Sequence, residues 1–290
     1  MSNSEHSVSP LINLSTSFRE VFMEVCHKGF SVLGRIPPLT PDDINRWYYG
    51  SAHPPSYFSS YRYYSLKTLQ IAQKLQPKTI LDVAGGTGFK AACLYEPGRR
   101  VVLNDLRFLE DDVQKLLTGK KIETVWGNFF DLKRESLGQF DLVMACEVIE
   151  HIAHGDQFIN HLKQFVSPKG YLLLTTPNGS YFRSKLPTYS QITDFTVFES
   201  EQFKPDADGH LYLYTPEEIR CLLEASGFRD ISIDLSITPF LSGHMALRFL
   251  PSSQLLTPMY YSLDTCLKNF GMKARTKVCT QMIVTAQLIN

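Results

Sequence analysis

An acidic residue followed by a glycine-rich turn is the feature of this sequence best suited to chemistry. The apolar run Thr79–Val83 carries Asp82 near its end, and Gly85, Gly86 and Gly88 follow at once. This order is typical of a parallel strand that leads into a nucleotide-binding loop at the carboxyl edge of a sheet. Glycines let the backbone approach a ligand closely. A carboxylate at this point would repel a pyrophosphate, so it favours a cationic ligand that carries an amine.

The same loop also allows a second interpretation, as a dinucleotide-binding fingerprint. Residues 86–91 fit the pattern G-x-G-x-x-A, and Asp105 lies 19 residues beyond Gly86, as that fingerprint requires. The position of Asp82 separates the two interpretations, because there it would face the pyrophosphate. A nicotinamide-dependent oxidoreductase stays an alternative, and NAD(H) binding would reveal it.

A second group of reactive side chains follows a later apolar run and consists of Glu147, Glu150 and His151. Their spacing predicts that all three lie on one side of a helical turn. Three explanations are open. His151 could act as a general base, since an imidazole has a pKa near ~6.5. The group could bind a divalent cation with His210 as a distant fourth ligand. Alternatively, Glu147 contacts a cofactor through its backbone while Glu150 and His151 brace the helix.

An alternation of short strands and helices is expected to position these groups. Apolar strands that alternate with helices specify a parallel sheet covered on both faces. The expected strands are Thr79–Val83, Arg100–Asn104, Ile122–Trp126, Phe140–Cys146 and Gly170–Thr176, and the expected helices are Phe89–Tyr95, Leu109–Leu117 and Asp156–Val166.

The carboxyl-terminal third continues this pattern with a well-marked helix. Thr215 is expected as its N-cap, Pro216 as its first residue, and Gly227 ends it. Two further strands are predicted, one over about 228–237 and a last one over 278–288. The roughly forty residues between them are too many for a turn, so they must form a substructure of their own.

The domain organisation is predicted as a helical amino-terminal cap over 1–76 and one main domain over 77–290. Insertions near 177–214 and 238–277 would cover the active edge of the sheet. Three aromatic-rich regions are candidates for acceptor binding: Trp47–Tyr64 as a lid, Tyr181–Tyr212, and the insertion that contains Phe240, His244, Met245, Tyr260 and Tyr261. Packing of these rings on the domain is the alternative.

Composition limits the classes of partner. Lys and Arg together number 29, as do Asp and Glu, so no net positive field favours a nucleic acid. The six cysteines form no C-x-x-C pair, which favours a reducing compartment. The polar amino terminus lacks the layout of a signal peptide, and no apolar run approaches the roughly 20 residues that span a bilayer. A cytoplasmic protein without a membrane partner is predicted.

With Asp82 included, the glycine loop resembles motif I, D-x-G-x-G-T-G, of the class I S-adenosylmethionine-dependent methyltransferases. Ala84 replaces the first glycine of that motif. Seven further segments follow in the family's order: the acid in Leu103–Leu106, Gly127–Phe129, Phe140–Val143, Glu147–Ile152, Pro168–Leu172, Thr176–Asn178, and His210–Glu218. The resemblance implies a Rossmann-like α/β fold, with a seven-stranded, mostly parallel sheet whose last strand is antiparallel.

The resemblance also implies roles for individual residues. Asp82 and the loop from Ala84 through Gly85 and Gly86 to Gly88 would hold the methionine part of S-adenosylmethionine, and Asp105 would accept both ribose hydroxyls. The remaining cofactor contacts would come from Leu106, Asn128, Phe129, Glu147, Tyr57 and Arg62. His151 and Glu150 are the expected catalytic residues, and no metal is assigned.

Two groups within this family share the segment Glu147–His151. With His210 it resembles the metal site of the small-RNA 3′-terminal 2′-O-methyltransferases. It is equally similar to the ubiquinone-biosynthesis O-methyltransferases, and the pattern H-x-x-x-x-T-P-E-E that begins at His210 is typical of this small-molecule group. Together with the neutral charge balance, this predicts methyl transfer to oxygen or nitrogen of a small molecule, with S-adenosylhomocysteine as product. The RNA enzyme and a non-catalytic scaffold are the alternatives.

Overall fold

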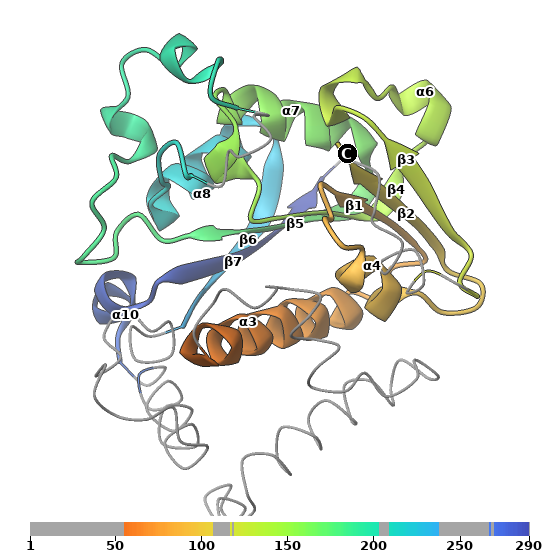
Figure 1. Ribbon diagram of the computed structural model, residues 1–290, viewed down its shortest axis with the longest axis horizontal. Helices are drawn as coiled ribbons and strands as arrows, with labels where there is room; N and C mark the ends of the chain where they lie inside the picture. The colour runs from red at the N-terminus through yellow and green to blue at the C-terminus, as the bar shows by residue number, and fades with distance from the viewer. Residues whose placement is uncertain are drawn as a thin grey trace, which may run out of the picture.

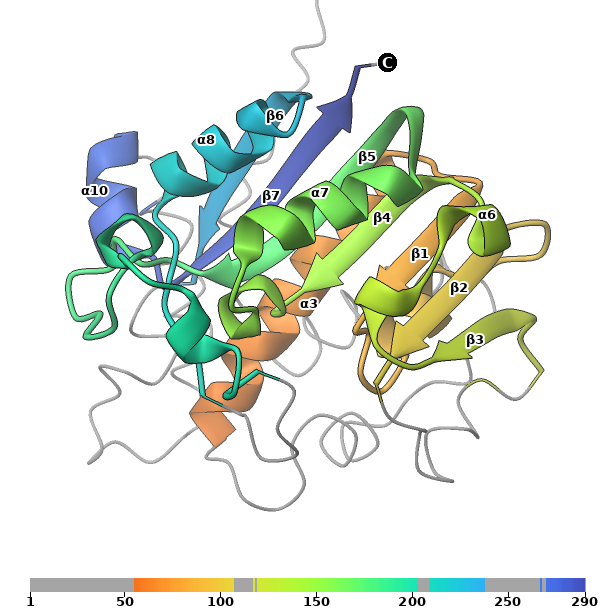
Figure 2. The same cartoon turned by 90° about the horizontal axis from the view of Figure 1, so that it is seen from above.

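A single mixed sheet organises the chain (Figures 1 and 2). The computed structural model describes residues 55–106, 117, 119–202, 209–237, 267 and 270–289, with the backbone alone for 55–63 and 66. Its strand order is β3-β2-β1-β4-β5-β7-β6. The strands are β1 (Thr79–Val83), β2 (Arg100–Asp105), β3 (Ile122–Trp126), β4 (Phe140–Cys146), β5 (Val166–Pro177), β6 (Phe228–Ser236) and β7 (Gln281–Leu288). The longer helices are α3 (Pro55–Lys74), α4 (Phe89–Leu94), α7 (Gly155–Phe165), α8 (Pro216–Ala225) and α10 (Met272–Val278), with the single turn α6 (Arg134–Leu137).

Strand directions confirm the predicted fold class. The pairs β1–β2, β1–β4, β2–β3 and β4–β5 are parallel. Strand β7 lies between β5 and β6 and is antiparallel to both, so it alone runs against the other strands of this sheet. The carboxyl ends of β1, β2 and β4 therefore meet at one edge, which is where parallel sheets bind ligands.

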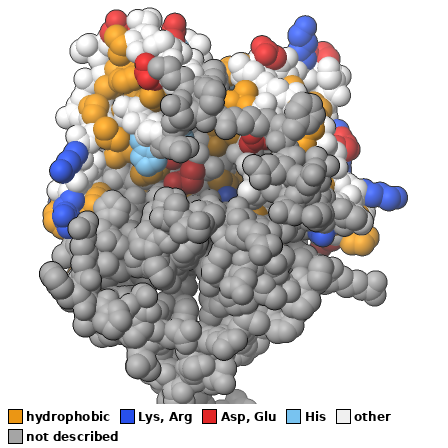
Figure 3. Space-filling model, viewed as in Figure 1, with side chains coloured by type: hydrophobic (Ala, Val, Ile, Leu, Met, Phe, Trp, Pro, Cys, Tyr) orange, Lys and Arg blue, Asp and Glu red, His pale blue; other side chains and the backbone are white. Residues whose placement is uncertain are grey.

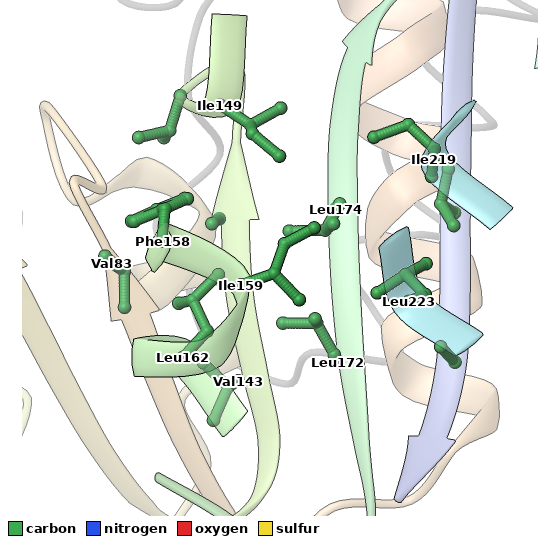
Figure 4. Close-up of a cluster of buried hydrophobic side chains, with 14 of the residues drawn as sticks. Val83, Val143, Ile149, Phe158, Ile159, Leu162, Leu172, Leu174, Ile219 and Leu223 are labelled. Atoms are coloured by element: carbon green, nitrogen blue, oxygen red, sulfur yellow. The ribbon is translucent and has the colours of Figure 1, made fainter. Parts of the chain in front are cut away.

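Helices cover both faces of the sheet, as the apolar strands require. On one face α7 and α8 pack against alternate strand residues (Figure 4); the labelled side chains of this cluster are Val83, Val143, Leu172 and Leu174 from the strands, Phe158, Ile159 and Leu162 from α7, Ile219 and Leu223 from α8, and Ile149. On the other face Leu69 and Ala72 of α3 pack with Phe89 and Leu94 of α4. Because successive strand residues point to opposite faces, Ile80 joins this second cluster while Leu81 joins the first.

The expected helix after residue 215 is confirmed in its details. The Thr215 hydroxyl accepts a hydrogen bond from the Glu218 amide at 3.2 Å, and the Glu218 carboxylate accepts one from the Thr215 amide at 2.6 Å. This reciprocal pair is a capping box, and it fixes where α8 begins. Gly227 follows the helix with φ +90°, a conformation that glycine adopts without strain.

Other predicted bounds were wrong. Strand β5 begins four residues earlier than expected, at Val166, and the last strand begins at Gln281 because residues 272–278 form α10. Apolar and β-branched residues continue across Val278, so the sequence pattern did not reveal where the helix ends and the strand begins. The helix expected over 109–117 lies outside the described residues, apart from Leu117. Among the described residues, no helix is long and apolar enough to cross a bilayer.

Candidate functional site

The loop between β1 and α4 turns sharply under the carboxyl edge of the sheet. Ala84, Gly86 and Gly88 have φ values of +49°, +57° and +69°, all in the left-handed region. Glycine is required at residue 85 for a different reason: a Cβ there would lie 2.4 Å from Leu103 Cδ1. Ala84 occupies a conformation that costs an L-residue about 1–2 kcal/mol, which explains why glycine is usual at this point of the motif.

Asp82 lies beneath this loop with its carboxylate buried. The side chain is 1% exposed, and neither carboxylate oxygen has a hydrogen-bond partner of acceptable geometry among the described residues. Burial raises the pKa of Asp82 to about 6, while the Lys90 ammonium and the nearby Ala91 amide oppose the rise. Burying a carboxylate is costly unless donors or a positive charge offset the cost, and here the Lys90 ammonium and the Ala91 amide do so only in part.

Asp105, at the end of β2, lies across the loop from Asp82. Its Oδ2 accepts a hydrogen bond from the Gly86 amide at 2.8 Å. The preceding residue, Asn104, is buried, and its Nδ2 donates to the carbonyls of Val125 and Gly127 at 3.0 and 3.1 Å. Asn104 was not assigned a role from the sequence. Its position in an apolar strand, next to the acid that ends it, could have indicated a buried amide with a structural role. It ties β2 to the β3 end and so fixes the position of Asp105.

A cavity of about 200 Å³ opens beside this loop. Some of the residues that line it were predicted as site residues and others were not. Its lining includes Val83, Ala84, Asn104, Leu106, Gly127, Asn128, Phe129, Phe130, Glu147, Val148, His151, Ile152 and Phe158. Such a mixture of apolar walls and a few polar groups is typical of a small-molecule site.

Asn128 and Phe129, which line the cavity, also contact neighbouring protein residues. The Asn128 Oδ1 accepts a hydrogen bond from the Phe130 amide at 3.1 Å and so caps the 3-10 turn Phe129–Asp131. The Phe129 ring is 6% exposed and packs edge-on against Phe158 and His161, with centroid distances of 5.8 and 4.9 Å. Phe129 therefore belongs to the core and to the cavity wall at the same time.

The segment after β4 does not form the single helical turn that was expected. Glu147 has φ +57°, and only Ile149–His151 form a 3-10 turn. The Glu147 Oε1 accepts hydrogen bonds from the hydroxyls of Tyr64 at 2.7 Å and Thr175 at 2.9 Å. Burial raises the pKa of Glu147, and these two hydroxyls oppose the rise. Glu147 Oε1 is thus directed toward Tyr64 of α3 and Thr175 of β5, while the residue also lines the cavity.

Glu150 is fully buried behind the turn. Its Oε2 accepts a hydrogen bond from the Thr176 hydroxyl at 3.0 Å, whereas Oε1 has no partner among the described residues. Burial, with the added effect of the Glu147 charge, raises the pKa of Glu150 well above its usual value. Thr175 and Thr176 were not predicted as site residues, but both end β5 next to the glutamates.

His151 and His210 meet beside Glu150. Their rings lie 5.1 Å apart, and the His151 Nδ1 is 3.1 Å from the Gly209 carbonyl oxygen. Ligand atoms of Glu150, His151 and His210 all lie within 4.8 Å of one another. Burial and the neighbouring His151 lower the pKa of His210 to about 4. On the face of the molecule drawn in Figure 3, histidine and acidic side chains lie next to each other at the surface.

The segment that carries His210 is fixed against the turn. The Leu211 amide donates to the Glu150 carbonyl at 2.9 Å, and the Tyr212 hydroxyl lies 3.0 Å from the Ile152 carbonyl. Tyr189, Phe195 and Phe198, which were candidates for acceptor binding, pack around Tyr212. The structure therefore uses these three rings for packing.

Some predicted residues are beyond what the structure describes. Tyr57 and Arg62 lie on α3, but only their backbone is described. The lid region 47–54, Phe203, and the aromatic residues predicted between 240 and 261 lie outside the described residues.

Comparison with known proteins agrees with this geometry. Residues 57–233 match the family model described as "Methyltransferase domain". The ubiquinone biosynthesis O-methyltransferase of Rickettsia prowazekii is 35% identical over 104 residues, which are 34% of this chain and 40% of that protein. Its counterpart from Bordetella avium is 27% identical over 112 residues, 38% and 46% of the two chains. The match thus spans less than half the length of these relatives.

A solved structure supports the fold. Phosphoethanolamine N-methyltransferase 2 of Haemonchus contortus, in complex with S-adenosyl-L-methionine, superposes with a TM-score of 0.52 at 17% identity, covering 95% of this chain and 60% of that one. The motif I loop and the acid that ends β2 agree with the family match. The chain belongs to the methyltransferase domain family, and its fold is that of the class I S-adenosylmethionine-dependent methyltransferases.

Proposed function

We propose that the protein transfers the methyl group of S-adenosylmethionine to an oxygen or nitrogen atom of a small-molecule acceptor. The observation that supports this most is the cavity at the carboxyl edge of the sheet, whose lining includes Ala84, at the start of the glycine loop, and His151. Alignment of nucleophile, methyl and sulfur would supply most of the acceleration, because a sulfonium is already activated. The partial matches to ubiquinone biosynthesis O-methyltransferases favour an oxygen acceptor.

In this proposal the loop over Asp82 holds the methionine part of the cofactor. The unpaired Asp82 carboxylate supplies negative charge beneath the loop, and the backbone from Ala84 to Gly88 surrounds the ligand. Asp105 accepts the ribose hydroxyls and keeps its bond to the Gly86 amide, since a carboxylate has about four acceptor sites. Leu106, Asn128 and Phe129 would meet the adenine.

Residues of the amino-terminal part complete the site in the same proposal. Tyr57 and Arg62 on α3 would contact the carboxylate end of the cofactor, and Glu147 would contact it from the cavity wall. Residues 1–76 would act as a cap, with the segments near 177–214 and 238–277 over the acceptor. A cytoplasmic location without a membrane partner belongs to the proposal, and the balanced charge supports the absence of a nucleic-acid partner.

His151 is the proposed general base, and Glu150 assists it. With Nδ1 near the Gly209 carbonyl, the neutral tautomer that donates there leaves Nε2 as the proton acceptor. General-base help of this kind contributes on the order of 10² or more in rate. His151→Ala is expected to lower turnover by that factor and to leave the affinity for S-adenosylmethionine unchanged.

A second candidate is methyl transfer assisted by a divalent cation. Glu150, His151 and His210 offer one carboxylate and two imidazoles within 4.8 Å, and the Glu150 Oε1 has no protein partner among the described residues. This donor set fits a cation such as Mn²⁺. A bound cation would polarise an acceptor hydroxyl, and His151 would then be a ligand instead of a base. The acceptor in this case includes a hydroxyl at an RNA end.

One set of measurements tests both candidates. Calorimetry with S-adenosylmethionine, S-adenosylhomocysteine and NAD should show binding of the first two alone; binding of NAD in their place would overturn the proposal. Titration with Mn²⁺ separates the candidates, because His210→Ala should abolish cation binding while His154→Ala, a histidine paired with Glu199 outside the group, should not. Release of S-adenosylhomocysteine, measured over a panel of catechols, phenols and amines with and without chelator, then identifies the acceptor class.

A further inference from the structure

Tyr64 of α3 reaches across the fold to the cavity wall. Its side chain is 2% exposed, and its hydroxyl lies 2.7 Å from Glu147 Oε1 and 3.1 Å from the Met282 carbonyl oxygen. The ring packs with Ile237 and Ile283, at the ends of β6 and β7. Tyr64 therefore joins the helix that precedes the glycine loop to the residue that follows β4, over a separation of 83 residues.

Hydrogen bonds hold both the backbone and the side chain of Glu147. Its backbone is in the left-handed region with φ +57°, and its amide donates to the Thr175 carbonyl at 2.8 Å. Its Oε1 accepts from two hydroxyls, Tyr64 and Thr175. The charged or titratable neighbours that act on it are Lys90 of α4, Glu150 of the following turn and Cys146 of β4.

We infer that Tyr64 is a positioning residue that fixes the Glu147 carboxylate at the wall of the cofactor cavity, so that the site favours the methyl donor, with its positively charged sulfur, over the product, whose sulfur is neutral. This rests on the proposed function. S-adenosylmethionine carries a sulfonium, whereas S-adenosylhomocysteine carries a neutral thioether. A carboxylate whose charged oxygen accepts hydrogen bonds is held in place. It attracts the sulfonium of S-adenosylmethionine more strongly than the neutral thioether of S-adenosylhomocysteine.

The Tyr64 hydroxyl matters in this role because burial disfavours the carboxylate form of Glu147, and a hydroxyl donor stabilises it. Without that donor, Glu147 would lose one of its two hydroxyl contacts and part of its negative charge. The ring would still fill the space between β6, β7 and α3. Removal of the hydroxyl alone therefore separates the positioning role from packing.

The test compares Tyr64→Phe with Tyr171→Phe in the full-length chain. Tyr171 is a half-buried tyrosine of β5, paired with Gln287 and Leu142, and it is not among the residues that line the cavity. Calorimetric affinities for both ligands are measured for each protein. Tyr64→Phe should weaken S-adenosylmethionine binding by on the order of 10-fold, because Glu147 loses part of its negative charge, and change S-adenosylhomocysteine binding by less than about 2-fold. Tyr171→Phe should match the wild type.

A second variant makes the result decisive. Glu147→Gln should remove the preference for the charged ligand, and adding Tyr64→Phe to it should change nothing further, because the two residues act through one contact. An equal loss of both affinities in Tyr64→Phe, or no loss, overturns the inference while the proposed function stands. If the wild-type protein binds neither ligand, the proposed function fails and this inference fails with it.

Discussion

Gly85 lies directly over the side chain of Asp82. A Cβ on residue 85 would come within 2.8 Å of both Asp82 Cγ and Asp82 Oδ2. The glycine is thus required by close approach, and its φ is not in the left-handed region. This contact also explains how the loop shields the carboxylate from water, which is the origin of its raised pKa.

Gly85→Ala should therefore abolish cofactor binding. The added methyl would push the loop away from Asp82 and Leu103, so the backbone could no longer surround the ligand. Calorimetry with S-adenosylmethionine is the measurement, and the matched control is Gly271→Ala, where a Cβ would meet nothing within 4 Å. Wild-type affinity in Gly85→Ala would show that the loop is not at the binding site.

Asp105→Ala should lower the affinity for S-adenosylmethionine by about 100-fold or more. Two hydrogen bonds from ribose hydroxyls to a carboxylate would be lost, each worth about 1.5–3 kcal/mol. Glu135→Ala, which removes an exposed acid from α6, is the control. Affinity within a factor of two of the wild type would refute the role given to Asp105.

The stability of the ligand-free protein should depend on pH through Asp82. The pKa of this carboxyl is about 6 in the folded protein and near its ordinary 3.8 in the unfolded chain. Between these values the folded state holds the extra proton, so the free energy of unfolding falls as pH rises from about 4 to 6, by a total of about 3 kcal/mol from this residue. Glu147 and Glu150 act in the same direction.

Asp82→Asn isolates this contribution. Urea unfolding at pH 4.5, 6 and 7.5 should show a smaller decrease with pH in the variant than in the wild type. Parallel pH profiles for the two proteins would mean that Asp82 is ionised in the folded state at all three values.

Thr215→Ala should destabilise the protein by about 1 kcal/mol, the usual cost of removing an N-cap. The Thr215 hydroxyl accepts from the Glu218 amide, and α8 packs Ile219 and Leu223 into the core. Thr215→Ser keeps the acceptor and serves as the control. The measurement is urea unfolding at neutral pH, and equal midpoints for Ala and Ser would contradict the role of the cap.

Local patterns predicted much of this fold. The strand–acid–glycine order at residues 79–88 and the capping sequence at 215–218 are each contained in about ten residues, so their structure follows from their own chemistry. Strand β1 and the start of α8 were therefore placed correctly. The left-handed backbone of Glu147 broke the expected helical turn, and no local pattern marks such a residue.

Contacts between distant residues were harder to predict. His210, far from His151 in the sequence, was expected as a fourth ligand beside it, and its ring is 5.1 Å from that of His151 because the Tyr212 segment packs on the turn; Glu147, expected in the same group, is not part of it. Tyr64 was grouped with a possible aromatic lid, whereas its hydroxyl binds Glu147 inside the fold. Such pairs depend on where the sheet brings the chain together, and sequence spacing does not contain that information.

The place of β7 between β5 and β6 has a consequence for synthesis of the chain. Strand β6 ends at Ser236, and the strand that joins it to β5 begins only at Gln281. While the ribosome translates the intervening stretch, β6 and the exposed edge of β5 have no partner, and both edges are open to contact with other nascent chains. Chaperone capture during that interval, or aggregation of chains stopped before residue 281, would follow directly from this strand order.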